Sequence, residues 1–307
     1  MKKLFFFIAF LLPFSGVKAQ QDPQFSQNMF NRIAINPAAA GMEKGICASA
    51  INRQQWVGFD NAPVTTVFNV DAPVKFGNRE HGLGLTIISD KLGFEKNNNL
   101  HFSYSFHKKL GKGSLNFGLQ LGIQNNALKG QWIPPEENSD DPLLSGGQID
   151  ESQLVFDSGL GIFYQQNNFY LGASVTHLNQ STVKYGTSME IYLARHYYVM
   201  GGYTLQISEP WEIVPSLFYK TDGKISQIDI NSNIVYNKKF WGGVSYRIED
   251  AIVTMLGIQL KNGLRFGYAY DISTSKIAKG SHEFLLAYCF TPRLEKKKQR
   301  YKSVRFL

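Results

Sequence analysis

Apolar and polar residues alternate with a period of two through most of the chain after Ile46. In the stretch 115–124, for example, large apolar side chains occupy the odd positions, and Asn, Gly or Gln occupies the even ones. Successive side chains of a β-strand point to opposite faces, so this pattern predicts strands with one apolar and one polar face. The same alternation recurs at 100–107, 227–234, 264–271 and 283–290.

The alternating segments are about ten residues long and about fourteen in number, which is typical of an outer-membrane barrel. We therefore predict an all-β fold, an outer-membrane antiparallel β-barrel of about 14 strands with an N-terminal plug or rim segment. The predicted strands are 46–56, 64–74, 81–89, 98–110, 114–125, 154–166, 168–178, 192–207, 211–220, 225–237, 239–248, 251–260, 262–272 and 281–290.

A soluble β-sandwich would also alternate, but two features disfavour it. The polar face is rich in Gly, Asn, Gln, Asp and Arg, whereas a sandwich packs apolar side chains on both inner faces. The connectors also alternate between short ones, such as 111–113, and long ones, such as 126–153 and 179–191. Barrels of this kind have short periplasmic turns and longer outer loops, so an even strand count predicts that both termini are periplasmic.

The two ends of the chain differ from the alternating body. Residues 1–19 have two lysines after Met1, continue with LFFFIAFLLPF and end in a small-residue site, which indicates a secretory signal peptide rather than a membrane anchor. We expect four parts: this signal peptide, an N-terminal plug or rim segment at 20–44, the barrel at 45–290, and a basic periplasmic tail at 291–307.

The net charge of +8 comes from these ends. Without residues 1–19 and the tail, 22 basic residues face 23 acidic ones, so the body gives no reason to expect a nucleic-acid partner. The tail holds seven basic residues, among them Lys296, Lys297 and Lys298, against Glu295 alone. It is suited to electrostatic capture of a periplasmic partner or of outer-membrane lipid head groups, although a solvated tail would have the same composition.

The segment 20–44 is polar, yet it carries several large apolar side chains and two prolines. Proline cannot donate to a strand ladder, and free disorder would leave those apolar groups wet. Three arrangements stay open: a plug or lining of the lumen mouth, contact with a periplasmic partner, or a lead-in packed on the barrel rim. The candidate partner-binding residues are Phe25, Met29, Phe30, Arg53, Trp56 and the three tail lysines.

The alternation also places charged side chains on the lumen face. A charge on the lipid face near the midplane costs about 2–4 kcal/mol. The inward set comprises Arg53, Asp71, Asp157, Asp229, Arg247, Arg265, Asp271 and Glu283. These charges either pair across the lumen or contact a plug or substrate segment, and the group that we expect to interact is Arg53, Asp71, Asp271 and Glu283.

Cys47 and Cys289 lie near the periplasmic ends of the first and last predicted strands, on the lumen side. Barrel closure pairs these two strands, and opposed residues of an antiparallel pair lie close enough for a disulfide. Because the register is not fixed by the sequence, a disulfide and two buried free thiols both stay open.

Motifs for catalysis or cofactor binding are missing from the sequence: it holds no P-loop, no G-x-G-x-x-G, no G-x-S-x-G and no H-E-x-x-H. Ser245, Ser281 and His282 lack the spacing of a hydrolase, and the carboxylates within 136–141 fit a solvated loop better than a calcium loop. We therefore expect no enzyme activity, no cofactor and no metal site.

Five blocks, in order along the chain, resemble the PorP/SprF family of type IX secretion and gliding-motility membrane proteins. They are DPQFSQNMFNRIAINPAAAGM (22–42), RQQWVGFDNAPVTTVFNVDAPV (53–74), WGGVSYR (241–247), FGYAYDISTSKI (266–277) and GSHEFLLAYCF (280–290). The alanines at 38–40 and the basic extension after Pro292 are less typical of the family.

The resemblance implies a non-enzymatic outer-membrane barrel that helps to export a cell-surface protein, such as an adhesin, and to retain it there. It also implies links to the periplasmic machinery of secretion and gliding. Two other functions stay open, since barrels of this size can hold a lumen: a diffusion channel or solute transporter, and a purely structural anchor for periplasmic machinery.

Overall fold

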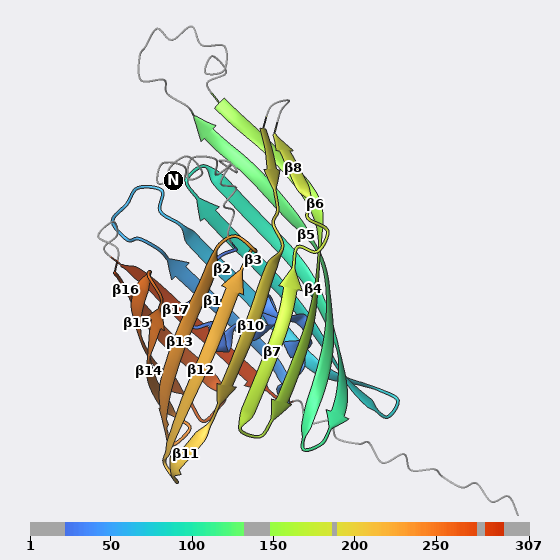
Figure 1. Ribbon diagram of the computed structural model, residues 1–307, viewed down its shortest axis with the longest axis vertical. Helices are drawn as coiled ribbons and strands as arrows, with labels where there is room; N and C mark the ends of the chain where they lie inside the picture. Colours follow the sequence, from blue (N-terminus) through green and yellow to red (C-terminus); the bar gives the residue numbers. More distant parts are fainter. Residues whose placement is uncertain (1–21, 132–147, 186–188, 275–279, 292–307) are drawn as a thin grey trace, which may run out of the picture.

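The computed structural model describes residues 22–131, 148–185, 189–274 and 280–291. The predicted signal peptide, the acidic residues 136–141 and the tail lysines 296–298 lie outside these ranges. The described chain forms a closed antiparallel β-barrel of 14 strands, as predicted (Figure 1). Its helical turns are all short, and none is long and apolar enough to cross a membrane within the described ranges.

The strands of the barrel follow one another around it in chain order. They are β1 (Ile46–Gln54), β2 (Val64–Phe76), β3 (Arg79–Leu92), β4 (Glu95–Leu110), β5 (Gly113–Gln131), β6 (Gln148–Gln166), β7 (Phe169–Thr176), β10 (His196–Tyr203), β11 (Leu205–Ser208), β12 (Trp211–Thr221), β13 (Ser226–Tyr236), β14 (Phe240–Arg247), β15 (Ala251–Gln259), β16 (Leu264–Ser273) and β17 (Ser281–Phe290). Both β10 and β11 pair with β12, so they count as one barrel strand that is interrupted at Thr204.

Each predicted strand segment contains a strand of the barrel, but the connector 179–191 was assigned wrongly. It holds a hairpin of β8 (Thr182–Tyr185) and β9 (Met189–Tyr192). The long connector before it is also shorter than predicted, since β5 runs on to Gln131 and β6 starts at Gln148. Val183 and Tyr185 of the hairpin pack with Leu128 of β5, which explains both differences: the extensions and the hairpin bury each other's apolar side chains.

The apolar face of each strand points outward. Phe102, Phe156, Ile230 and Leu256 are each about half or more exposed, which suits a surface in contact with lipid tails. The opposite face is buried although it is largely polar, with Asn69, Gln120 and many other amides and hydroxyls shielded from solvent. Something must therefore fill the lumen.

The N-terminal segment fills it (Figure 1, blue, inside the barrel). It folds into three short turns, η1 (Asn28–Phe30), α1 (Arg32–Ile35) and η2 (Pro37–Ala39), and residues 35–41 are all buried. The Asn36 side chain accepts a hydrogen bond from Ala38 N (3.0 Å), and Pro37 follows it at the first position of its turn, a favoured start for a helical turn. Of the arrangements left open, the segment adopts that of a plug.

The plug runs through the lumen rather than lying at one mouth. Asp22 lies beside His177 and His196, at the end of the barrel that carries the connector between β7 and β10. Gly45 lies at the opposite end, where Thr291 donates to the carbonyl of Lys44 (2.8 Å). The first and last described residues, Asp22 and Thr291, therefore lie at opposite ends of the barrel, which differs from the expectation that both ends of the chain share the periplasmic side.

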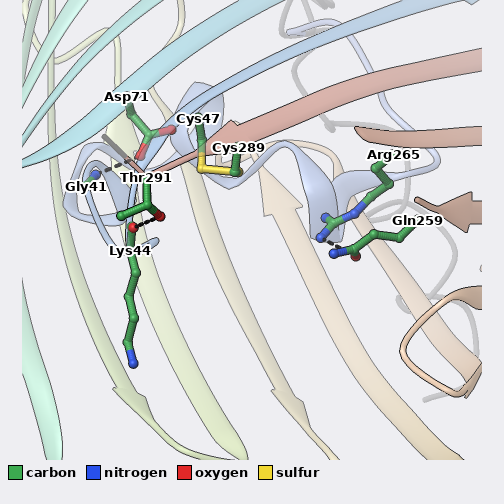
Figure 2. Close-up of a disulfide and its surroundings, with 8 residues drawn as sticks. All are labelled: Gly41, Lys44, Cys47, Asp71, Gln259, Arg265, Cys289 and Thr291. Atoms are coloured by element: carbon green, nitrogen blue, oxygen red, sulfur yellow. Dashed lines mark hydrogen bonds between the residues drawn. A yellow bond between two sulfur atoms is a disulfide. The ribbon is translucent and has the colours of Figure 1, made fainter. Parts of the chain in front are cut away.

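The barrel seam carries a disulfide between Cys47 and Cys289 (Figure 2). These residues are directly opposed in the register of β1 and β17, which pair from Ile46 with Phe290 to Gln54 with His282. Their Cα atoms lie 4.1 Å apart. Of the two outcomes that the sequence left open, the structure contains the bonded one.

Candidate functional site

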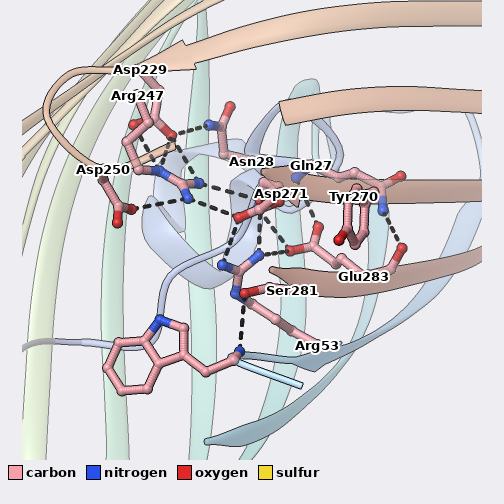
Figure 3. Close-up of polar contacts among 12 residues, drawn as sticks. Gln27, Asn28, Arg53, Asp229, Arg247, Asp250, Tyr270, Asp271, Ser281 and Glu283 are labelled. Carbon is pink, nitrogen blue, oxygen red and sulfur yellow. Dashed lines mark hydrogen bonds and ion pairs between the residues drawn. The ribbon is translucent and has the colours of Figure 1, made fainter. Parts of the chain in front are cut away.

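The strongest polar feature of the lumen is a charge cluster formed by Arg53, Asp229, Arg247, Asp271 and Glu283 (Figure 3). All five residues are at most 3% exposed, and they come from five different strands, β1, β13, β14, β16 and β17. Inward positions of neighbouring strands lie side by side, so residues far apart in sequence meet here.

The cluster is linked by ion pairs through Asp271. Its Oδ2 lies 2.7 Å from Arg53 Nη2 and 2.9 Å from Arg247 Nη1. Arg53 also contacts Glu283 (3.3 Å), and Arg247 contacts Asp229 (3.3 Å). Three carboxylates thus face two guanidinium groups, which leaves one negative charge to be satisfied by other donors.

The plug supplies those donors. The backbone N–H groups of Ser26 and Gln27 donate to the two carboxylate oxygens of Glu283, at 2.7 and 2.8 Å. The Ser26 hydroxyl donates to Asp271 (2.6 Å) and accepts from Arg53 (2.8 Å). Charge-assisted hydrogen bonds are about twice as strong as neutral ones. The cluster therefore binds the plug as well as pairing between nearby strands of one stretch of the barrel wall.

Asp71, which we expected beside Arg53, lies apart from the cluster. The register of β1 and β2 places Asp71 opposite Cys47, whereas Arg53 lies opposite Thr65. The carboxylate of Asp71 instead accepts from Gly41 N (2.8 Å), at the other end of the plug (Figure 2). Arg247 and Asp229, which were named only as inward charges, take its place in the cluster.

A second feature of the lumen is a glycine wall on β3 to β6, formed by Gly82, Gly84, Gly118 and Gly161. A Cβ added to any of these would overlap the plug: the carbonyl of Ala40 at Gly82, Ile33 at Gly84, the backbone of Pro37 and Ala38 at Gly118, and Asn36 at Gly161. The absence of side chains lets the plug backbone lie directly against the sheet. Ser105 adds a hydrogen bond to Ala38 O (3.0 Å).

The apolar residues of the plug pack inside the barrel. Phe25 is 7% exposed and belongs to a cluster with Ile51, Val67 and neighbouring lumen residues. Met29 and Phe30 pack against the same cluster, and the Phe30 ring lies 4.7 Å from that of Trp241. In this conformation a partner would reach Phe25 only if the plug moved.

Trp56 is placed differently from the other partner-binding candidates. It follows β1 in the connector 55–63, is 42% exposed, and its backbone N donates to Ser281 Oγ (3.2 Å). Val57 and Phe59 of the same connector are also well exposed. Exposed apolar side chains outside the strands suit contact with another protein.

The start of the plug is held by a second polar group, which we call the Asp22 cluster: Asp22, His177, His196 and Tyr198. Asp22 Oδ1 lies 2.8 Å from His177 Nε2, and Tyr198 donates to Oδ2. Burial alone would raise the pKa of Asp22, but the facing His196 and His177 outweigh it and hold that pKa well below its usual value. No sequence motif signals this group, because Asp22 is more than 150 positions away from its other three members.

Cavities lie at both ends of the plug. One of about 380 Å³ is lined by Asp22, His177 and His196, and one of about 360 Å³ beside it is lined by Trp56. At the other end, a cavity of about 360 Å³ is lined by Phe30, Cys47 and other residues.

The residues considered for catalysis do not meet. Ser245 lies on β14 and Ser281 on β17, with two strands between them, and His282 pairs with the Tyr268 hydroxyl (2.8 Å). The structure therefore does not assemble these three residues into a nucleophile with its base.

Comparison with known proteins gives one family. The model of the type IX secretion system membrane protein PorP/SprF matches residues 17–288. No curated protein matches the chain. Among solved structures, the Pseudomonas putida toluene transporter TodX has a TM-score of 0.52 at 9% identity, covering 85% of this chain and 93% of that one. The Ralstonia pickettii toluene transporter TbuX has a TM-score of 0.47 at 13% identity, covering 84% and 93%. At such identities the similarity to TodX concerns the fold alone.

Proposed function

Since the chain belongs to the PorP/SprF family of type IX secretion system membrane proteins, we propose that it is a non-enzymatic accessory barrel that helps to export a partner protein and hold it at the cell surface. The family and the fold make it an outer-membrane component of that system. The partner proposed is a secreted surface protein such as an adhesin, and the periplasmic machinery of secretion and gliding is the second contact.

The observation that carries the proposal beyond the family is the occupied lumen. The plug is bound by charge-assisted hydrogen bonds from the charge cluster and packed against the glycine wall. A diffusion channel needs a continuous path, whereas here the chain's own N-terminal segment lies inside the lumen (Figure 1). The lumen contents therefore favour a binding and anchoring role over solute passage.

We place the contact with the exported protein at the end that carries Trp56 and the long connectors, and we take this end to face the cell exterior. The opposite end, where the described chain stops at Thr291, then faces the periplasm. The basic tail beyond it is proposed to contact the periplasmic machinery or anionic lipid.

Solute transport is the second candidate, and the cavities at both ends of the plug are the observation in its favour. Conductance of the purified protein in planar bilayers separates the two functions. The anchoring role predicts a silent barrel that conducts after deletion of residues 22–41. Steady conductance by the intact protein would favour transport.

The anchoring role is tested by Trp56→Ala in the native host. We expect less of the exported protein on the cell surface and less of it recovered with the barrel from solubilised outer membrane. Trp211→Ala is the matched control, because Trp211 is similarly exposed, at 45%, but lies at the other end of the barrel. Equal amounts of surface protein in both variants and in the parent strain would show that Trp56 is not part of the contact. Unchanged export in a strain that lacks the barrel would refute the proposed function itself.

A further inference from the structure

The Asp22 cluster has the geometry of a metal site. One ligand atom each from Asp22, His177 and His196 lies within 4.8 Å of the other two, and both histidines are buried. Zinc binds histidine nitrogen at about 2.0–2.1 Å and carboxylate oxygen at about 2.0–2.2 Å, so ligand atoms around one ion stand roughly 3–4 Å apart. Small side-chain shifts would bring the three atoms to that spacing.

The surroundings orient the imidazole of His177 in the way that a metal-bound histidine is oriented. His177 Nδ1 lies 3.0 Å from a carboxylate oxygen of Asp157, which leaves Nε2 toward Asp22. His196 Nδ1 lies 3.0 Å from the carbonyl of Ala194 and 3.8 Å from Asp22 Oδ2. Its Nε2 accepts a hydrogen bond from the backbone N–H of Asp22 (3.3 Å), which a metal bound at that nitrogen would replace. A ring N–H that donates to a carboxylate or carbonyl fixes the tautomer and makes the other nitrogen a better ligand.

The charge of the site also fits a divalent cation. Asp22 and Asp157 bring two negative charges, which neutral imidazoles do not offset, while Lys220 brings one positive charge by donating to the Asp22 carbonyl (3.3 Å). The cavity of about 380 Å³ beside the cluster leaves room for a water as fourth ligand.

We propose that Asp22, His177 and His196 bind a zinc ion that ties the start of the plug to the connector between β7 and β10. Two imidazoles and one carboxylate are a ligand set that suits zinc, whereas calcium and magnesium prefer oxygen alone. The inference departs from the expectation of no metal site, which rested on the lack of a sequence motif. The ion would fasten the plug at the end opposite to the disulfide.

The test uses the mature barrel, purified in detergent, dialysed free of metal and titrated with zinc, with bound metal measured by mass spectrometry. We expect one zinc per barrel, and an affinity at least about tenfold lower in His196→Gln and in Asp22→Asn. His282→Gln is the matched control, because that histidine pairs with Tyr268 away from the cluster and should bind as the parent does.

Heat-modifiable migration on gels identifies the variants that still fold. Asp22→Asn changes a residue of the plug and leaves the barrel wall as it is. A second readout is protease cleavage near the start of the plug, which zinc should slow in the parent and in His282→Gln but not in His196→Gln. Absence of zinc binding by the folded parent, or equal binding by a His177→Gln, His196→Gln double variant, would overturn the proposal.

Discussion

The two halves of the plug are held in the lumen by opposite means. Residues 22–28 meet buried charges, and their backbone and hydroxyl groups complete an ion-pair network on β1, β13, β14, β16 and β17. Residues 33–41 meet a wall without side chains on β3 to β6, and shape alone makes most of that contact. One half is therefore fixed by electrostatics and the other by sterics, so different substitutions should release each.

Arg247→Ala should have the largest effect, because it disrupts the ion-pair network that holds residues 22–28. It leaves Asp229 and Asp271 buried with less compensation, and removing one partner of a buried pair costs about 3–5 kcal/mol. Guanidinium unfolding followed by tryptophan fluorescence measures the loss. Arg79→Ala, at an exposed position of β3, is the control. A loss no larger than that of the control would mean that the network contributes little.

Gly118→Ala should break the steric half. The added methyl would overlap the backbone of Pro37 and Ala38, and overpacking of a filled interior costs about 1–3 kcal/mol. We expect the plug to become sensitive to protease while the barrel stays folded. In Gly242→Ala the new Cβ meets only an ordinary contact of 3.5 Å, so that variant should behave as the parent. Equal protease resistance of both variants would show that the glycine wall does not hold the plug in place.

Two serine-to-alanine substitutions, one in each contact of the plug, compare the two halves with the smallest change in structure. Ser105→Ala removes a neutral hydrogen bond to Ala38 O and should cost about 0.5–1.5 kcal/mol. Ser26→Ala removes bonds to Asp271 and Arg53 and should cost about twice as much, because those partners are charged. Unfolding of both variants, measured at low and at high salt, gives the loss of unfolding free energy that each substitution causes. Equal losses would contradict the division into an electrostatic and a steric half.

The sequence predicts the barrel better than it predicts the lumen contents. Alternation alone assigns the strands and their faces, since every residue of a strand obeys a period of two. The alternation places Arg53, Asp271 and Glu283 on the lumen face. Together with the pairing of the first and last strands, it puts Cys47 near Cys289. The register between strands is not encoded in the alternation, and this is why Asp71 was expected beside Arg53.

The plug has no such period. Its path depends on which positions of the barrel wall lack a side chain. Gly82 and Gly118 can be recognised as plug contacts only once the pairing of the strands is known. The direction of the plug was missed for the same reason, because the contact of Asp22 with His177 and His196 joins positions far apart in the chain. The hairpin β8–β9 was missed because strands of four residues give too few alternations to detect.

The central claim is that the chain's own N-terminal segment occupies the lumen, and a cysteine cross-link tests it most directly. Ala38→Cys and Ser105→Cys would stand where Ser105 now donates to the Ala38 carbonyl (3.0 Å). In outer membranes from the native host, peptide mass spectrometry should find residue 38 joined to residue 105. The control pairs Ala38→Cys with Leu119→Cys, which faces outward at 41% exposure and should not cross-link. Folded barrels in which positions 38 and 105 stay unlinked under oxidising conditions would contradict the account.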